Sequence, residues 1–251
     1  MRRRELIAAL GSAAIFGPVA AGAEQKIARV GIIDDAPVWD VFRQQLRELN
    51  YIEGQSIAFD YRTAQGIPDR LRQAAEELSR IPVDVIAVFG TPAAQAAKRA
   101  TTRIPVVAIS IGDPIGAGLI ANFARPGGNV TGNTILGPDV VTKRLQILKD
   151  GIPNVSRVAF LWNPDNASNN AIWEQLRKAV PLFHMTLLPV KARVESDFVQ
   201  VFDQLSADAP DALLTTNDPL HQTQMKEVIA FLLRKRLQGC FRSNGTSSTA
   251  G

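Results

Sequence analysis

The sequence contains one cysteine and two histidines, and this scarcity excludes several classes of protein. With Cys240 alone, no disulfide can form within the chain, and we interpret this residue as a packed or surface thiol. His184 and His221 have no cysteine or acidic neighbour at ligand spacing. The sequence therefore offers few residues that could form a zinc site or a Ser-His-Asp arrangement. We therefore expect neither a disulfide scaffold nor a metal centre, and no cofactor.

Aromatic residues and excess charge are also sparse. The 251 residues include 11 Phe, 3 Trp and 2 Tyr, and 28 Lys and Arg stand against 24 Asp and Glu, a net charge of +4. Binding to a phosphate backbone requires a basic surface, so we expect no nucleic-acid partner. The hydrophobic share of 46% is too high for a disordered chain and suffices for one or two packed domains.

Residues 1–23 have the composition of an export signal. Arg2-Arg3-Arg4 precedes an apolar stretch over residues 6–20, and Ala21-Gly22-Ala23 supplies small residues before a cleavage site. The arginines suit a twin-arginine signal and the general secretory route alike, so the export route stays open. The stretch is shorter than the roughly 20 residues that span a membrane. We expect a periplasmic chain, cleaved after Ala23, without stable membrane insertion.

Along the mature chain, apolar runs alternate with segments of helical periodicity. Strands are predicted over residues 27–33, 56–61, 83–89 and 104–111, with helices over 38–49, 68–78 and 92–100. Strands that are apolar on both faces and separated by helices indicate an α/β fold with a parallel sheet. A Gly- and Pro-rich segment follows, and residues 129–134 are interpreted as a hinge crossing rather than as a regular element.

The order of elements then repeats. Arg29-Val30-Gly31-Ile32-Ile33 matches Arg157-Val158-Ala159-Phe160-Leu161, and Asp84 and Asp211 follow the two arginines after 55 and 54 residues. This agreement predicts two Rossmann-like lobes with parallel sheets. The N-terminal lobe is assigned to residues 24–128 and the C-terminal lobe to 135–241, and a polar disordered tail to 242–251.

Ligands of doubly wound sheets bind at the carboxyl ends of the strands. The candidate ligand-binding residues at these ends are Asp34, Asp35, Gly90, Thr91, Pro92, Asp113, Trp162, Asn163, Asn217 and Asp218. Free backbone N–H groups and the Thr91 hydroxyl could hold a carboxylate or phosphate, with simple N-capping by Thr91 as the alternative. Trp162 is interpreted either as a stacking wall for a ligand or as packing between the lobes.

Enzymatic patterns are incomplete. Residues 116–121 satisfy G-x-G-x-x-G/A, but they lie at the last strand-to-helix junction of their lobe, and no acidic residue ends a strand about 20 residues later. Ser56 is a near miss to G-x-S-x-G. We therefore expect a binding protein rather than an enzyme. A sensory domain of the same fold and an exported α/β hydrolase remain as alternatives.

Several segments together carry a family resemblance. They are residues 41–55, Pro68-Asp69-Arg70-Leu71, Gly90-Thr91-Pro92-Ala93-Ala94, Gly112-Asp113-Pro114, residues 124–132 and Leu161-Trp162-Asn163-Pro164. In these segments the chain resembles the substrate-binding proteins of ABC transporters, and more narrowly the exported subfamily whose members include tryptophan and tyrosine binders.

This resemblance implies a type I periplasmic-binding-protein fold. Two lobes would close on a small molecule, such as an aromatic or branched amino acid, and deliver it to a membrane permease. It also implies that Thr91 takes the ligand carboxylate and that Asp113 or Asp218 takes its ammonium group. Family members are expected to continue beyond residues 237–241, so the resemblance further implies an incomplete second lobe and a truncated chain.

Overall fold

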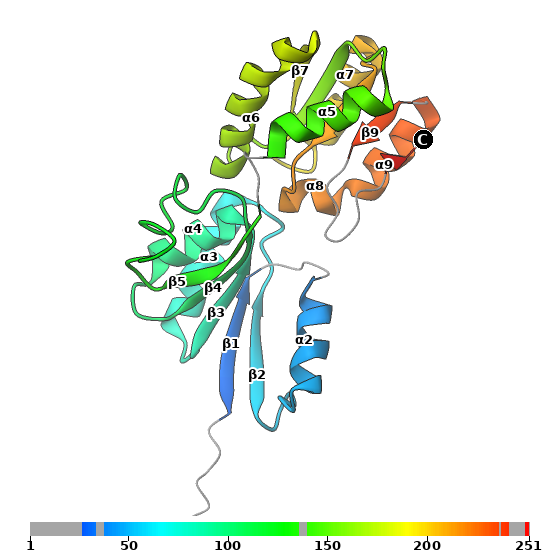
Figure 1. Cartoon of the computed structure of the whole chain (residues 1–251). Helices are drawn as coiled ribbons and strands as arrows, with labels where there is room; N and C mark the ends of the chain where they lie inside the picture. The colour runs from blue at the N-terminus through cyan, green and yellow to red at the C-terminus, as the bar shows by residue number, and fades with distance from the viewer. Residues whose placement is uncertain (1–26, 34–37, 136–139, 236, 241–248, 251) are drawn as a thin grey trace, which may run out of the picture.

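The computed structural model describes residues 27–33, 38–135, 140–235, 237–240 and 249–250. They form two α/β lobes, one above the other in Figure 1, each built on a five-stranded sheet. The expected export signal, Asp34, Asp35 and most of the expected tail lie outside the described residues.

The first lobe is a parallel sheet with helices on both faces. Its strands, in the spatial order β2-β1-β3-β4-β5, are β1 (Ala28–Ile33), β2 (Ile57–Arg62), β3 (Val85–Phe89), β4 (Val106–Ile111) and β5 (Val130–Thr134). Helices α3 (Pro68–Arg80) and α4 (Thr91–Ala100) bury one face of the sheet. Helix α2 (Val38–Glu48) packs on the other face through Trp39 and Phe42.

The second lobe repeats this arrangement in the strand order β10-β9-β8-β6-β7. Its strands are β6 (Arg157–Trp162), β7 (Thr186–Lys191), β8 (Ala212–Thr215), β9 (Gln238–Cys240) and β10 (Thr249–Ala250). Its helices are α5 (Val141–Gly151), α6 (Ala167–Ala179), the 3-10 turn η2 (Val180–Phe183), α7 (Asp197–Asp208), α8 (Pro219–Thr223) and α9 (Met225–Lys235). The order β7-β6-β8-β9 corresponds to β2-β1-β3-β4 of the first lobe, so the predicted α/β fold of two Rossmann-like lobes is confirmed.

The duplicated aspartates occupy the same structural position in both lobes. Asp84 Oδ2 accepts a hydrogen bond of 2.8 Å from the Arg29 N–H, and Asp211 Oδ2 accepts one of 2.8 Å from the Arg157 N–H. Backbone N–H groups of Ser156 and Arg157 stabilise the charged form, which lowers the pKa of Asp211. Each aspartate thus ties the start of one strand to the loop before its neighbour.

Two sequence interpretations need correction. The segment 129–134 is not an irregular crossing, because Val130–Thr134 form β5, paired in parallel with β4. Gly132 makes this pairing possible, since a Cβ there would lie 1.8 Å from the Ala108 carbonyl oxygen. The tail is not wholly irregular either. Thr249–Ala250 pair antiparallel with β9. Backbone pairing of this kind places little demand on sequence, because an edge strand offers N–H and C=O groups rather than side chains.

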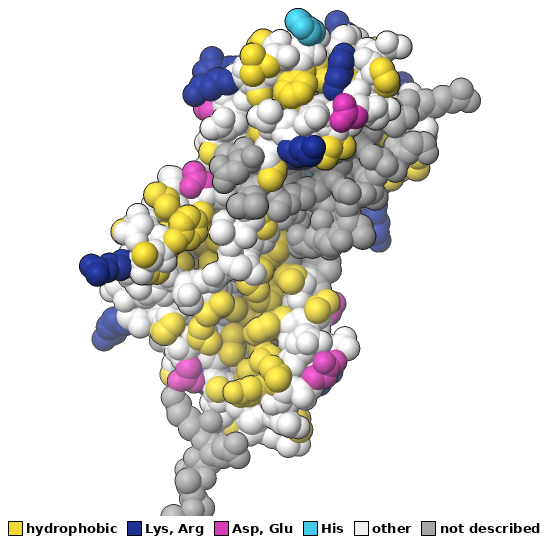
Figure 2. All heavy atoms as spheres, in the orientation of Figure 1, with side chains coloured by type: hydrophobic (Ala, Val, Ile, Leu, Met, Phe, Trp, Pro, Cys, Tyr) yellow, Lys and Arg dark blue, Asp and Glu magenta, His cyan; other side chains and the backbone are white. Residues whose placement is uncertain are grey.

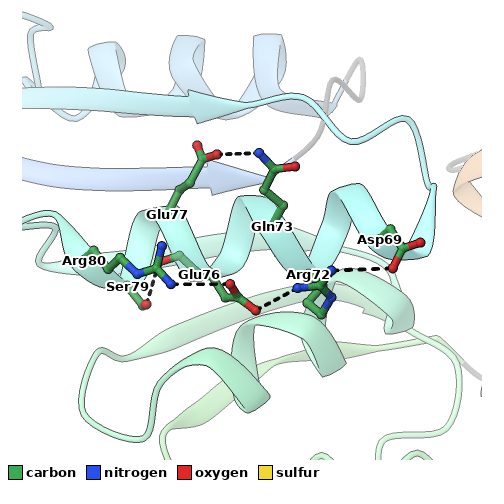
Figure 3. Close-up of polar contacts among 7 residues, drawn as sticks. All are labelled: Asp69, Arg72, Gln73, Glu76, Glu77, Ser79 and Arg80. Atoms are coloured by element: carbon green, nitrogen blue, oxygen red, sulfur yellow. Dashed lines mark hydrogen bonds and ion pairs between the residues drawn. The ribbon is translucent and has the colours of Figure 1, made fainter.

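Helix α3 shows how charged residues are placed away from the lobe core. Its outer face carries a row of ion pairs in which Arg72 lies 3.7 Å from Asp69 and 3.1 Å from Glu76, while Arg80 lies 3.5 Å from Glu76 (Figure 3). Each pair at this spacing stabilises a helix by about 0.2–0.5 kcal/mol. The charges of this face are therefore matched within the helix itself.

Part of the first lobe's apolar surface is incompletely covered. Figure 2 shows hydrophobic side chains gathered over the strands of this lobe. On the α2 side of the sheet, Val85 and Ile109 are only partly buried, and Val107 is 37% exposed. This face is covered most fully at β1, where Val30 and Ile32 are buried, and least at β4.

Candidate functional site

The carboxyl ends of the two sheets face each other across a seam between the lobes. Almost all core side chains are apolar, and the buried polar side chains among the described residues gather at these strand ends and at the helix starts that follow them. They are Thr91, Ser110, Asn163, Asn166, Ser168, Asn169, Thr215, Thr216, Asp218 and His221. Burying a polar group without a partner is costly, so buried polar groups are normally hydrogen-bonded. Their concentration at this one place indicates a candidate functional site.

Two helix N-termini converge at this seam. Thr91 is the first residue of α4 and Ser168 the second of α6, and their hydroxyl oxygens lie 2.6 Å apart. The Gly112 N–H donates to Thr91 Oγ1 over 3.4 Å. Helix N-termini carry partial positive charge and unpaired N–H groups, so this point favours an anion. The N-capping alternative for Thr91 is wrong, because Gly90 is the N-cap residue and the Thr91 hydroxyl crosses the seam.

Two glycines lie where the lobes are in close contact. A Cβ on Gly90 would lie 2.8 Å from Pro219 Cγ, and a Cβ on Gly112 would lie 2.6 Å from Ser168 Cβ. Gly90 also has a φ of +83°, which favours glycine. Beside this contact, Pro92, Asn163 and other residues line a cavity of about 10 Å³. That volume is too small for an organic solute, so the lobes must separate to admit one.

The Asp218 side chain forms its hydrogen bonds within the second lobe. Its carboxylate is 1% exposed, and Oδ2 accepts hydrogen bonds from Asn166 Nδ2 (2.8 Å) and Asn169 Nδ2 (2.9 Å). Oδ1 accepts from the Leu220 N–H over 3.0 Å. These three donors fix the start of α6 against the start of α8. The expected role of Asp218 as the partner of a ligand ammonium group is therefore replaced by a structural one.

The remaining polar candidates lie at the seam with identified partners. Asp113 is half-buried, and its Oδ1 accepts from the Gly116 N–H over 2.8 Å, which shapes the loop after β4. Asn163 Oδ1 accepts from the Asp165 N–H over 3.0 Å. Asn217 Nδ2 donates across the seam to Ser110 Oγ over 2.9 Å.

Trp162 packs inside the second lobe. Its ring stacks on Trp173, with centroids 5.2 Å apart and planes 8° apart, and its centroid lies 6.2 Å from that of Phe160. The side chain is 6% exposed and belongs to the core between α5, α6 and the sheet. Both sequence interpretations of Trp162, a ligand wall and packing between the lobes, are therefore replaced by packing within one lobe.

Three site residues were missed by sequence reasoning. Ser110 lies inside a predicted strand and Ser168 in the first turn of α6, where nothing local distinguishes them from packing residues. Arg144 of α5 donates from Nη2 to the Thr215 carbonyl oxygen over 2.7 Å and brings a cation to the end of β8. Its position 71 residues before Thr215 gives no sequence signal.

The nucleophile of the hydrolase alternative is far from this site. Ser56 lies just before β2, at the opposite end of the sheet from the seam, and its Oγ accepts from the Ile52 N–H over 2.9 Å. Both histidines belong to the second lobe. Among the described residues, no three His, Cys, Asp or Glu side chains converge as metal ligands would, and no helix is long and apolar enough to cross a membrane.

His221 is buried completely beside the seam. Its Nδ1 lies 3.2 Å from Thr215 Oγ1 and 3.3 Å from Thr216 Oγ1. Burial lowers the pKa of His221, and the nearby Asp218 charge and the Ala192 backbone oppose this shift without cancelling it. The imidazole is thus neutral in the folded chain at neutral pH.

We expect the free energy of unfolding to fall in acid because of His221. The unfolded imidazole, with a pKa of about 6.5, binds a proton that the buried one resists, so stability is fully present above pH ~6.5 and is lost as pH falls below it. Urea unfolding at several pH values should show this slope. His221→Asn should flatten it, whereas His184→Asn, at an exposed position, should leave it. An unchanged slope in His221→Asn would contradict the assignment.

Two lobes of matching strand order, with strand ends facing across a polar seam, define the type I periplasmic-binding-protein fold. Residues 37–231 match the model of the ABC transporter substrate binding protein family, and the chain belongs to that family. The predicted resemblance is thereby confirmed.

Individual relatives agree with this assignment. The chain is 30% identical over 129 residues to a tyrosine-binding protein of Clostridioides difficile (strain R20291), a match that covers 51% of this chain and about a third, 36%, of that protein. An ABC domain from Streptococcus pneumonia solved in complex with L-Trp has a TM-score of 0.76 at 21% identity, covering 87% of this chain and 75% of that one. A conserved domain protein from Vibrio cholerae has a TM-score of 0.76 at 29% identity, covering 85% and 73%.

Proposed function

We propose that the chain is the solute-binding component of an ABC importer. It captures a small carboxylate, with an aromatic amino acid as the best candidate, between its lobes in the periplasm and delivers it to a membrane permease. The convergence of two helix N-termini and two hydroxyls at Thr91 and Ser168 carries this proposal. The family supports a binding role without catalysis, one relative is named as a tyrosine-binding protein, and another was solved in complex with L-Trp.

The seam supplies the interactions that a carboxylate needs. When the lobes separate, the contact between the Thr91 and Ser168 hydroxyls opens, and a carboxylate between them accepts a hydrogen bond from each lobe. The N-terminus of α4, which has no side-chain cap, adds backbone N–H donors, whereas the Ser168 N–H of α6 already donates to Asn166 Oδ1. The solute then takes the place of the direct contact and bridges the lobes, which makes closure depend on binding.

The other candidates complete the proposed pocket. Asp113 lies on the loop after β4 and keeps its Oδ2 for a solute ammonium group, since Oδ1 holds the Gly116 N–H. Asn163 and Asn217 follow β6 and β8 at the strand ends of the second lobe. Asp34 and Asp35 follow β1 in the sequence and remain proposed as contacts at the same edge.

Replacing the Thr91 hydroxyl is expected to weaken carboxylate binding. Thr91→Val keeps the volume and removes one hydrogen bond to a charged group, which contributes about 1.5–3 kcal/mol, so Kd should rise by roughly tenfold or more. The measurement is the thermal midpoint of the full chain against increasing L-tyrosine or L-tryptophan, since a ligand that binds only the folded state raises it. Thr186→Val, at an exposed position of β7, is the matched control. Equal affinities in both variants would refute the role of Thr91.

A further inference from the structure

Ser110 has a backbone conformation that a strand does not normally contain. It lies inside β4 with a φ of +65°, in the left-handed region that serine rarely adopts. The register between β4 and β5 shifts at this point, between Ala108 and Ile111. A non-glycine residue in this region is strained and persists only where its surroundings hold it, often at functional sites.

Two asparagines from different parts of the fold hold Ser110. Its N–H donates to Asn133 Oδ1 of β5 over 2.7 Å, and its Oγ accepts from Asn217 Nδ2 over 2.9 Å. Asn217 is fixed in turn, because its Oδ1 accepts from Gln222 Nε2 of α8. The serine side chain is 7% exposed, so these bonds are shielded from water.

One of these two contacts, from Asn217, crosses between the lobes, and the other, from Asn133, lies within the first lobe. β5 is the last strand before the chain enters the second lobe, and Asn217 lies on the loop between β8 and α8 that also carries Asp218. Gly112, which touches Ser168 in the closed arrangement, follows Ser110 by two residues. Any change in the backbone of Ser110 therefore shifts the contact surface of the first lobe.

We propose that Ser110 is a positioning residue that latches the closed arrangement. In the closed lobes, Asn217 holds the hydroxyl and keeps the residue left-handed. When the lobes part, this bond breaks, and Ser110 relaxes toward the extended conformation of its strand. The change at Ser110 couples β5 to the seam between the lobes, because the residue has one backbone conformation when the lobes are closed and another when they are apart. The inference rests on the proposed function only in that solute entry requires the lobes to separate.

Hydrogen exchange of the full chain without added solute tests the latch. Ser110→Ala and Ser110→Gly remove the bond to Asn217, and each should speed amide exchange over residues 214–223 about fivefold, the loss of one net hydrogen bond. Asn217→Ala also removes the acceptor of Gln222 Nε2, so it should speed exchange at least as much. The double variant Ser110→Ala/Asn217→Ala should exchange no faster than Asn217→Ala alone, because both substitutions remove the same bond. Ser79→Ala, whose hydroxyl bonds only within α3, is the control and should leave this segment unchanged (Figure 3).

Backbone strain gives a second readout. Ser110→Gly should unfold at a higher temperature than Ser110→Ala, because glycine adopts the positive φ of the closed arrangement without steric strain, whereas alanine either keeps that strain or leaves the closed arrangement. Wild-type exchange in Asn217→Ala, or additive effects in the double variant, would overturn the latch, and equal midpoints for the two Ser110 variants would overturn the strain argument. Because no solute is added, these results are independent of whether Thr91→Val binds solute.

Discussion

Replacing Gly112 by alanine is expected to hold the lobes apart and to weaken solute binding strongly. The new Cβ would lie 2.6 Å from Ser168 Cβ and 2.9 Å from Ser168 Oγ, so rotation of the serine cannot relieve both contacts. Overpacking of this kind costs about 1–3 kcal/mol, and here it falls on the closed arrangement alone, which predicts a rise in Kd of roughly ten- to hundredfold.

Calorimetric titration and small-angle X-ray scattering measure this effect. Gly112→Ala should show a larger radius of gyration in the presence of solute than the wild-type chain. Its far-UV circular dichroism spectrum should be unchanged, because the secondary structure is kept. Gly128→Ala is the matched control, because nothing lies within 4 Å of a Cβ there. Wild-type affinity in Gly112→Ala would mean that solute does not bind between the closed lobes.

Asp218→Ala is expected to cause the largest loss of stability. It leaves the amide groups of Asn166 and Asn169 and the Leu220 N–H without an acceptor in a buried site. A buried donor left unsatisfied costs about 1–3 kcal/mol, so the three together should lower the free energy of unfolding by roughly 3 kcal/mol or more.

Denaturant unfolding followed by near-UV circular dichroism checks this value. Asp165→Ala is the control on the same lobe, since Asp165 is 45% exposed and forms only a 3.4 Å ion pair with Arg193, which contributes about 0–1 kcal/mol. If Asp218→Ala unfolds at the same denaturant concentration as Asp165→Ala, then the buried carboxylate does not organise the lobe as described.

Most strands were predictable because their sequences are apolar on both faces. Val85–Phe89 and Arg157–Trp162 consist mainly of branched and aromatic residues, as expected of strands covered by helices on both sides. β5 was missed because Val130–Thr134 read VTGNT, with one buried residue at the edge of the sheet. Its pairing depends on Gly132 fitting against Ala108, a contact that no local pattern reveals.

The site was predictable in its location and less so in its roles. Gly90, Thr91 and Asn163 meet at the seam because parallel strands end at one edge, a rule that needs only the order of elements. The role of Asp218 depended on amide groups 49 and 52 residues away, and that of Trp162 on a ring across the lobe core. Such side-chain partners are set by packing, which the sequence pattern does not specify.

Calorimetric titration of the full chain with two matched pairs of compounds tests the central claim most directly. The pairs are L-tyrosine with tyramine and L-tryptophan with tryptamine, which differ only in the carboxylate. The account predicts binding of one molecule per chain for at least one amino acid, and affinity at least about tenfold weaker for its amine, since the missing group removes charge-assisted hydrogen bonds. Equal binding of an acid and its amine, or no binding of either acid, would contradict an aromatic carboxylate held between the lobes.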